Sequence, residues 1–447
     1  MSRPTVELAM IVRNGGEQLA RCLRSALPAL DGILIGDTGS TDESIRIASL
    51  FGARVVNVPW EEDFSQARNA VLAAARADWV LWLDADEMLS PAGAAQIPSL
   101  VAQDEIDAFE VWRWNYVRTL NSRSGGLLAE PNPVMIEEAR PYPAYTRYLN
   151  TLLFRRLPGV YFENPVHETV SRRVRALGLR AAEAPFVIHH FGFVEGGEEM
   201  RREKNEHYYH LGLKKVRENP TDAWAYYELA LSELEHRRNP ANAFRCFEYA
   251  RSLNPGNRNA WIYAGIALTR MGRLKEALEY LEQVAEGGFR SGLLVEALGD
   301  VYFQKGEDAQ ALRWYEEAGS SSGVSPAIAC KRGACEVRLG ERAQGLQRIK
   351  DAILREPEAG ELYEIWAAAL LQAGDAPAAA QVAAHRLQLG CPPAGSFLVS
   401  AVLEAHLGHW EQALAALHEG LRRYPGDPEL EREARLAQEK AATLAAA

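Results

Sequence analysis

Hydrophobic and polar positions follow two different patterns along the chain, and the change falls near residue 200. Before it, short runs rich in Val, Ile, Leu and aromatic residues alternate with segments of helical periodicity. The expected strands cover 6–12, 32–37, 53–60, 79–84, 108–117, 151–156 and 186–193, and the helices between the first four cover 16–27, 42–51 and 64–76. Strands that alternate with helices predict βαβ units and a mostly parallel, Rossmann-like sheet.

After residue 200 the strand pattern stops and a repeat of 34 residues begins. Its glycines are Gly272, Gly306, Gly340, Gly374 and Gly408, and the small residues five positions after them are Ala277, Ala311, Gly345, Ala379 and Ala413. A glycine suits the turn between two helices because it accepts positive φ, and a small residue lets the helices approach closely. This pattern resembles the tetratricopeptide repeat and predicts a solenoid of about six helix pairs.

The expected organisation is therefore an α/β domain followed by an all-α solenoid. We expect the α/β domain at 1-200, a connecting helix at 201-221, the repeats at 222-430 and a helical tail at 431-447. In the stretch GDTGSTDES, Ser40 is expected to cap the second helix, with Glu43 reaching back to form a capping box.

Composition narrows the class of protein. The formal net charge of −11 argues against a nucleic-acid binder that relies on phosphate neutralisation. The start MSRPTVELAMIVRNGG is too short in apolar residues for a signal peptide, and no segment approaches the roughly 20 apolar residues that span a bilayer. The five cysteines lack metal-ligand spacing and indicate a reducing compartment. A cytoplasmic protein without a membrane span is expected.

Acidic residues follow two of the predicted strands. Asp37 ends the second strand and Asp84 the fourth, and Asp86, two residues on, would point the same way as Asp84 along an extended backbone. Ligands of open α/β sheets bind at these carboxyl ends. Neighbouring carboxylates repel unless a cation or a proton lies between them, and Mg²⁺ or Mn²⁺ would bridge them to substrate phosphates. Taken singly, Asp37 is better explained as a helix cap, and Asp84 with Asp86 as a solvated turn.

Three stretches taken together resemble a known family. MIVRNGGEQLARCLRSA, GILIGDTGSTDES and DFSQARNAVLAAARADWVLWLDADE occur in an order similar to glycosyltransferase family 2, whose fold is named GT-A. The resemblance covers roughly the first 200 residues, and the added repeats are similar to those of bacterial members that include peptide glycosyltransferases. It implies a nucleotide-sugar donor and an inverting displacement, catalysed by a transferase of the hexosyltransferase type.

The resemblance assigns roles by position. Asp37 matches the aspartate that bonds the nucleobase or ribose, and Asp86 the residue that binds the metal. Arg68 would offer charge to the diphosphate. The nucleotide-sugar site implied in this way consists of Val12, Asn14, Asp37, Arg68, Asn69, Asp84 and Ala85. The family often reads N-E-E after the first strand, whereas this chain has N-G-G-E at 14–17.

Two later motifs complete the expected site. Direct displacement needs a carboxylate that takes the proton of the acceptor, and Glu168 in YFENPVHETV is the candidate, with Glu87 and Glu163 as alternatives. In VIHHFGF, either histidine could bind the metal through neutral imidazole or serve as a hydrogen-bonded structural residue. Strand alternation and the family match favour His190 as the ligand.

Three functions remain open from the sequence. The first is a glycosyltransferase whose repeats recruit a peptide or protein acceptor. The second is the same chemistry on a cell-surface saccharide or lipid-linked glycan, with the repeats serving homo-oligomerisation or partner docking. The third is an inactive scaffold, which the intact acidic set disfavours. Residues 113–134, rich in Gly, Ser, Asn and Pro, are expected to form a mobile loop on the acceptor side.

Overall fold

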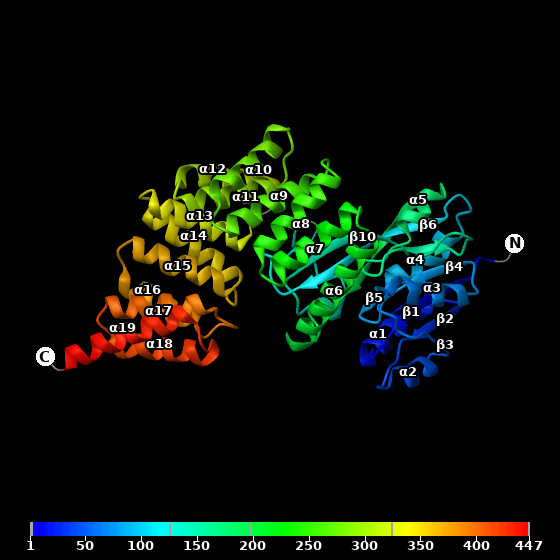
Figure 1. Ribbon diagram of the computed structural model, residues 1–447. Coiled ribbons are helices and arrows are strands. Elements are labelled where there is room, and N and C mark those ends of the chain that lie inside the picture. The colour runs from blue at the N-terminus through cyan, green and yellow to red at the C-terminus, as the bar shows by residue number, and fades with distance from the viewer. Residues whose placement is uncertain (1–2, 125–126, 197, 323–324, 446–447) are drawn as a thin grey trace. The chain divides into compact units, whose positions relative to one another are not determined.

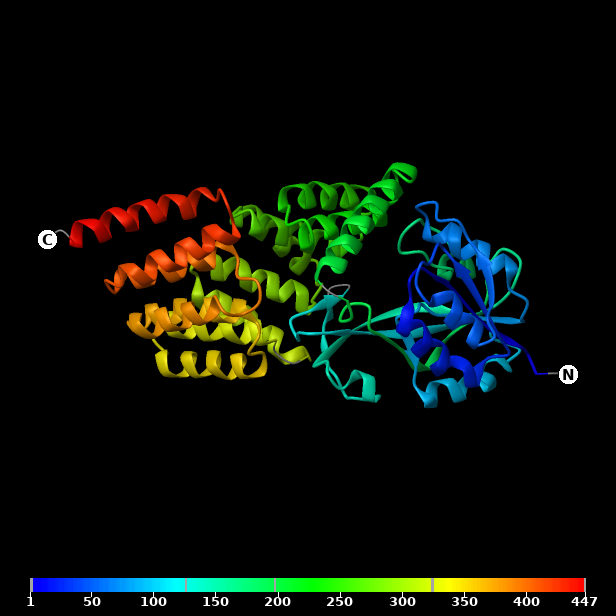
Figure 2. The same ribbon diagram turned by 90° about the horizontal axis from the view of Figure 1, so that it is seen from below.

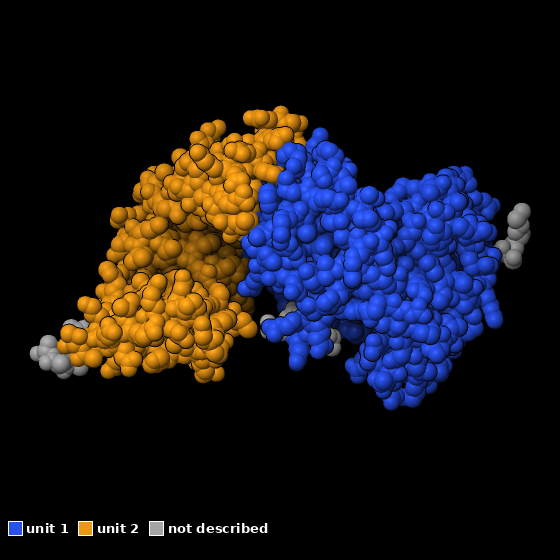
Figure 3. Space-filling view, viewed as in Figure 1, with its two compact units in different colours: residues 1–267 blue, residues 268–447 orange. Residues whose placement is uncertain are grey.

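The computed structural model describes residues 3–124, 127–196, 198–322 and 325–445. They form two compact units, Met1–Ala267 and Leu268–Ala447 (Figure 3). The unit that contains the sheet thus extends beyond the boundary at residue 200 that the sequence suggests. None of the described helices combines the length and the apolar character that a membrane crossing requires.

The first unit is built on a mixed sheet with the strand order β3-β2-β1-β4-β10-β6-β11-β5, and β9 pairs with β10. Strands β3, β2, β1 and β4 lie side by side in this order and are all parallel. Strand β10 runs antiparallel to both β4 and β6. The bounds are β1 (Val6–Val12), β2 (Gly32–Asp37), β3 (Arg54–Asn57), β4 (Trp79–Trp82), β5 (Glu87–Leu89), β6 (Ala108–Val117), β9 (Glu130–Pro131), β10 (Ala144–Arg155) and β11 (Ala181–His190). The expected α/β class is confirmed.

Helices pack against this sheet and enclose the core (Figure 1). Helix α3 packs on β1 and β2, α1 on β5, and α4 on β11. The helices are α1 (Gly16–Ala26), α2 (Ser44–Leu50), α3 (Phe64–Ala74), α4 (Pro91–Val101) and α5 (Ser171–Ala176). Residues 79–83, the apolar run of β4, are fully buried, as a strand covered on both faces requires. The long strands β6 and β10 extend past the parallel strands (Figure 2).

The expected capping box at the start of α2 is wrong. Helix α2 begins at Ser44, and the amide of Ser44 donates to Asp42 Oδ1 over 3.0 Å. Ser40 instead accepts a hydrogen bond from the amide of Asn14 through its hydroxyl. The capping box does not form because residues 37–42 bond the loop that follows β1. Asp42 accepts from the amide of Gly16, at the end of that loop, over 3.0 Å.

The connecting helix α6 (Glu198–Glu218) is part of the first unit. Its Tyr208 ring lies 5.8 Å from the ring of Phe64, and its His207 ring lies 5.8 Å from that of Trp60. Helices α7 (Ala223–Glu235) and α8 (Pro240–Leu253) follow it. The buried Lys215 bonds Glu228 of α7 over 2.6 Å. Helix α6 therefore packs on the α/β domain through aromatic side chains and on α7 through an ion pair.

The remaining helices follow one another in antiparallel pairs. The pairs are α9 (Arg258–Arg270) with α10 (Leu274–Glu286), α11 (Gly292–Lys305) with α12 (Asp308–Ser322), α13 (Pro326–Arg338) with α14 (Arg342–Arg355), α15 (Gly360–Gln372) with α16 (Ala376–Arg386), and α17 (Ala394–His406) with α18 (Trp410–Arg423), followed by α19 (Pro428–Ala445). The repeat glycines have φ between 72° and 101°, and the small residues five positions later are buried. Both features meet the expectation of helix pairs.

Candidate active site

Asp84 and Asp86 lie in a tight turn between β4 and β5. The amide of Glu87 donates to the carbonyl of Asp84 over 3.0 Å, and Glu87 Oε2 accepts from the amide of Asp84 over 2.8 Å. The backbone therefore folds back at this point, and the expectation of an extended segment from 84 to 86 is wrong. Because of the turn, the two aspartates have different partners.

Asp84 faces two arginines. Arg68 Nη2 lies 3.0 Å from Asp84 Oδ1 and 2.5 Å from Glu168 Oε1, and Arg113 Nη2 lies 3.7 Å from Asp84 Oδ2. Burial by itself raises the pKa of Asp84, but Arg68 and Arg113 outweigh it and hold that pKa below its ordinary value. The guanidinium of Arg68 also stacks over Trp82, 5.0 Å from the ring centroid. Asp84 is thus a fixed, ionised carboxylate.

Glu87 lies beneath the turn and is fully buried. Its Oε1 forms an ion pair with Arg113 Nε. Burial raises the pKa of Glu87 to about 7, in spite of the opposing influence of Arg113. Glu87 therefore has both oxygens engaged, one with Arg113 and the other with the backbone of the turn, and it positions these groups. Because it is fully buried, it cannot take a proton from an acceptor substrate.

Asp86 faces His190 across the end of β11. Asp86 Oδ2 lies 3.4 Å from His190 Nε2, and His190 Nδ1 lies 2.6 Å from Asn115 Oδ1. An amide oxygen only accepts, so Nδ1 carries a hydrogen and Nε2 faces the carboxylate. Burial raises the pKa of Asp86, but His190 outweighs it and holds the pKa far below its usual range. A proton on Nε2 satisfies this contact, and a cation between the two groups would do the same.

Gly192 provides the space in which this pair meets. A Cβ built on Gly192 would lie 2.3 Å from Asp86 Oδ2 and 2.6 Å from His190 Nε2. Non-bonded contacts as short as these essentially never occur, so a side chain at position 192 fits only if both groups move. The glycine follows Phe191, whose amide donates to the carbonyl of Asp86 over 3.0 Å. The loop after β11 and the turn after β4 are therefore tied together at this point.

The neighbouring histidine has another role. His189 is fully buried on the opposite side of β11, and its Nδ1 lies 2.8 Å from the hydroxyl of Tyr116. Burial lowers the pKa of His189 to about 4, which keeps the ring neutral. Alternation along the strand separates the two histidines as expected, with His190 directed toward Asp86.

The other end of the site lies at the carboxyl ends of β1 and β2. Val12 and Asp37 are partners in the parallel ladder, and Asp37 Oδ1 accepts from the amide of Ser40 over 3.0 Å. Asn14, with φ of 56°, accepts from the amide of Thr41 over 2.8 Å. These residues shape the loops at the edge of the sheet, and Asp37 does not cap α2.

The N-G-G-E sequence has a packing reason. A Cβ on Gly15 would lie 2.8 Å from Val12 Cγ2 and 3.3 Å from the Cβ of Ala85. The amide of Gly15 donates to the hydroxyl of Ser44 over 2.8 Å. The first loop therefore lies directly beside the turn that carries Asp84 and Asp86, and the larger residue of the family pattern would be too close to Val12.

Three expectations need correction. Asn69 exchanges two hydrogen bonds with the backbone of Phe162, over 2.9 and 2.8 Å, so its amide holds a neighbouring segment and is not directed toward a nucleotide. The charge of Arg68 is taken up by carboxylates, since this buried residue contacts Asp84 and Glu168. Residues 113–117 belong to β6, and 123–124, 127–128 and 130–131 form short strands; 125–126 lie outside the described residues.

Sequence reasoning missed Arg113, Asn115 and Gly192. The first two lie two positions apart on β6, so they share one face of the strand. That alternation is visible in WRWNYV, but only the sheet order places this face beside the turn after β4. Gly192 is missed for a different reason, because its effect is the absence of an atom between residues that are far apart in the sequence.

The donor set fits a divalent cation. Asp84, Glu87 and Glu168 pair with Arg68 and Arg113, whereas Asp86 faces His190. Within the described residues, no three His, Cys, Asp or Glu side chains form a complete metal site. The Asp86–His190 pair would thus supply two ligands, and Mg²⁺ or Mn²⁺ commonly takes its other ligands from water and phosphate.

Residues of the first unit are similar to a family of known proteins. Residues 8–148 match the model of the family described as "Glycosyl transferase family 2". A TPR repeat-containing protein of Synechococcus elongatus is 35% identical over 195 residues, which are 42% of this chain and 42% of that protein. The SPbeta prophage-derived glycosyltransferase SunS of Bacillus subtilis is 29% identical over 96 residues, which are 21% of this chain and 23% of that one.

The chain thus spans less than half the length of either curated relative. Among solved structures, a tetratricopeptide repeat protein of Parabacteroides merdae is 13% identical with a TM-score of 0.43, covering 54% of this chain and 94% of that one. Residues 8–148 are thus similar to glycosyltransferase family 2, and paired helices with a 34-residue glycine repeat follow them.

Proposed function

We propose that the protein is an inverting, metal-dependent glycosyltransferase that moves a sugar from a nucleotide-sugar donor to a peptide or protein acceptor recruited by the repeats. The observation that carries the proposal is the pair of Asp86 and His190, 3.4 Å apart, in and beside the turn that follows the parallel strand β4. In open α/β sheets, ligands bind at the carboxyl ends of such strands.

Asp86 and His190 would hold the metal, which is Mg²⁺ or Mn²⁺ on this proposal. When bound, such an ion neutralises charge on the departing diphosphate. Asn115 fixes the tautomer of His190 through its amide oxygen. Asp84 is held by Arg68 and lies two residues before the proposed metal ligand, and on this proposal it would contact the ribose.

Glu168 is the group best placed to take the proton of the acceptor. Arg68 holds its Oε1 over 2.5 Å, which fixes the carboxylate while its side chain keeps 10% exposure. Of the two alternatives, Glu87 is fully buried on Arg113. Glu163 is bonded through its backbone to Thr169 across a narrow hairpin. Glu168 pairs with Arg68, which also holds Asp84, and its side chain keeps some exposure, whereas Glu87 is fully buried.

The acceptor part of the proposal rests on the repeat unit. A groove of about 410 Å³ is lined by residues of α13 and α14. Its lining is Ala329, Arg332, Gln344, Gln347, Arg348, Asp351, Ala352 and Arg355. Gln344 and Arg348 bond Glu336, and Gln347 bonds Asp351, so an extended peptide would meet a lining of polar side chains that are already paired.

Replacing Glu168 by glutamine separates binding from chemistry. The amide keeps a hydrogen bond to Arg68 but cannot accept a proton, so we expect donor affinity near that of the wild type. Turnover should fall at least about 100-fold, the low end for a positioned general base. Calorimetric binding of the nucleotide sugar and steady-state rates measure the two effects. A large loss of donor affinity would instead make Glu168 a ligand, and the base would have to be sought elsewhere.

Replacing Asn115 by alanine tests the orientation of His190. Loss of the acceptor for Nδ1–H frees the ring to turn and to change tautomer, so the affinity for Mn²⁺ should fall about 10- to 100-fold. Asn115→Asp keeps an acceptor at this place and should restore most of that affinity. Titration of Mn²⁺ followed by electron paramagnetic resonance measures both variants. Equal affinities of wild type and Asn115→Ala would contradict this positioning role.

The experiment that tests the proposed function is a donor screen. The full chain is incubated with Mn²⁺ and UDP-, GDP-, CDP- and TDP-linked sugars, and release of the nucleoside diphosphate is followed. We expect slow hydrolysis of at least one donor, abolished by EDTA. No release from any of these donors, by a folded protein, would count against the proposal.

A further inference from the structure

Helix α6 places two side chains near the carboxylates of the active site. Lys204 and Tyr208 lie four residues apart, which is one turn of the helix. Lys204 Nζ lies 5.7 Å from the centroid of the Tyr208 ring. That ring in turn lies 5.8 Å from Phe64 and 6.3 Å from His167, which precedes Glu168. The aromatic contacts fix the position of this turn of α6 beside the site.

Electrostatic interactions agree with this placement. Burial raises the pKa of Tyr208, and the charges of Glu168, Asp84 and Asp86 raise it further. Lys204 lies close enough to Asp86 to interact with it electrostatically. Both side chains of α6 therefore lie within the field of the same carboxylates.

Lys204 differs from the arginines of the site in its partners. Arg68 and Arg113 each pair with two carboxylates and are largely buried. Lys204 is exposed and has no ion pair with any residue in the described part of the chain. Its charge is therefore available to a ligand, whereas the charges of the two arginines are not.

We propose that Lys204 binds the diphosphate of the donor, with the ring of Tyr208 supporting its side chain. This inference rests on the proposed function and replaces Arg68 as the source of positive charge for the leaving group. A nucleoside diphosphate carries more negative charge than one divalent cation neutralises, so a second cation beside the metal stabilises it. A lysine suits this role because its ammonium is a compact point charge on a flexible stem.

The test compares nucleotides that differ by one phosphate. UDP, GDP, CDP and TDP, and the corresponding monophosphates, are titrated calorimetrically into the full chain with Mg²⁺ and again with EDTA. For the diphosphate that the wild type binds most tightly, Lys204→Met should weaken binding about 10- to 100-fold, the range for a lost charge-assisted hydrogen bond. The loss should persist in EDTA and be small for the monophosphate. Lys204→Arg should restore most of the affinity.

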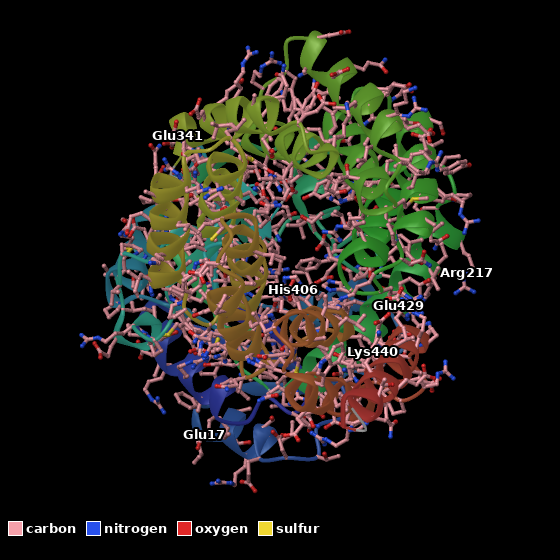
Figure 4. All side chains as sticks on the ribbon, turned by 90° about the vertical axis from the view of Figure 1, so that its left-hand side faces the viewer. Glu17, Arg217, Glu341, His406, Glu429 and Lys440 are labelled. Carbon is pink, nitrogen blue, oxygen red and sulfur yellow. The ribbon has the colours of Figure 1, made fainter. Side chains whose placement is uncertain are left out.

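Arg217→Met is the matched control, because it also removes one positive charge from α6. Arg217 is exposed and projects outward from the ribbon (Figure 4). It lies thirteen residues, or about 20 Å of helix, from Lys204. We expect this variant to bind both nucleotides as the wild type does. An equal loss in both variants would show a general effect of charge and overturn the proposal.

The Mn²⁺ affinity of the nucleotide-free protein distinguishes the proposal from a structural role for Lys204. On the proposal, removing a cation beside Asp86 should leave this affinity unchanged or higher. A structural role would instead lower this affinity, or weaken the binding of mono- and diphosphate equally, and either result would overturn the proposal. If the wild type binds a diphosphate and Lys204→Met binds it equally well, only the role of Lys204 fails. If the wild type binds none of these nucleotides, the proposed function fails.

Discussion

Replacing Asp86 by alanine is expected to abolish metal-dependent turnover of the donor while leaving the fold intact. The substitution removes the oxygen ligand that faces His190. Loss of the metal removes several kcal/mol of charge stabilisation from the transition state, so turnover should fall at least about 10³-fold. Because His190 holds the pKa of Asp86 far below its usual range, removal of the side chain also costs some stability, and a thermal melt separates this effect from the loss of metal.

Asp104→Ala is the control for this prediction. The side chain of Asp104 is 92% exposed and lies near Arg155, outside the site. Turnover with the native donor, Mn²⁺ affinity and a thermal melt are measured for both variants. Turnover of Asp86→Ala within a few-fold of the wild type would contradict the role assigned to this carboxylate.

Replacing Gly192 by alanine should have an effect of similar size without any change of charge. The new methyl group must displace both Asp86 Oδ2 and His190 Nε2, which would otherwise lie 2.3 and 2.6 Å from it. A misplacement of about 1 Å at one group can cost 10²-fold in rate. Because two groups move together, we expect a loss of about 10³-fold in turnover and a clear loss of Mn²⁺ affinity.

Gly395→Ala serves as its control. A Cβ at Gly395 meets no atom within 4 Å, and the residue lies at the start of α17. Alanine there should leave turnover unchanged and stabilise the helix slightly. Calorimetry with Mn²⁺ and steady-state rates decide the comparison. If Gly192→Ala bound Mn²⁺ as tightly as the wild type, Asp86 and His190 would not act as a pair of ligands.

The strands and helices near the site could be predicted because each has a local cause. β1, β2 and β6 follow the expected bounds, since runs of apolar and β-branched residues end at polar residues. Strand β5, only three residues long, was missed. It forms because the turn at Asp84 brings residues 87–89 beside β11, and three residues are too few to show a strand pattern in the sequence. The repeat was predictable for another reason, since each glycine turn recurs with a fixed interval.

The sequence suggests some residues of the candidate site but does not show their contacts. Alternation along β11 favours His190 over His189, and the structure directs the two rings to opposite sides. The pairing of Arg68 with Glu168 could not be read from the sequence, because the two residues are a hundred positions apart. The role proposed for Lys204 could not be inferred from the sequence. It depends on which face of α6 packs against Phe64, and helical periodicity alone does not identify that face.

The central claim is that Asp86 and His190 hold a divalent cation that binds the diphosphate of a nucleotide. A crystal structure of the full chain with Mn²⁺ and the most tightly bound nucleoside diphosphate tests it most directly, because Mn²⁺ is located by its anomalous scattering. The account predicts one anomalous peak about 2.1 to 2.3 Å from Asp86 Oδ2 and His190 Nε2, bridged to phosphate oxygens. A nucleotide bound elsewhere, or an anomalous peak away from both side chains, would contradict it.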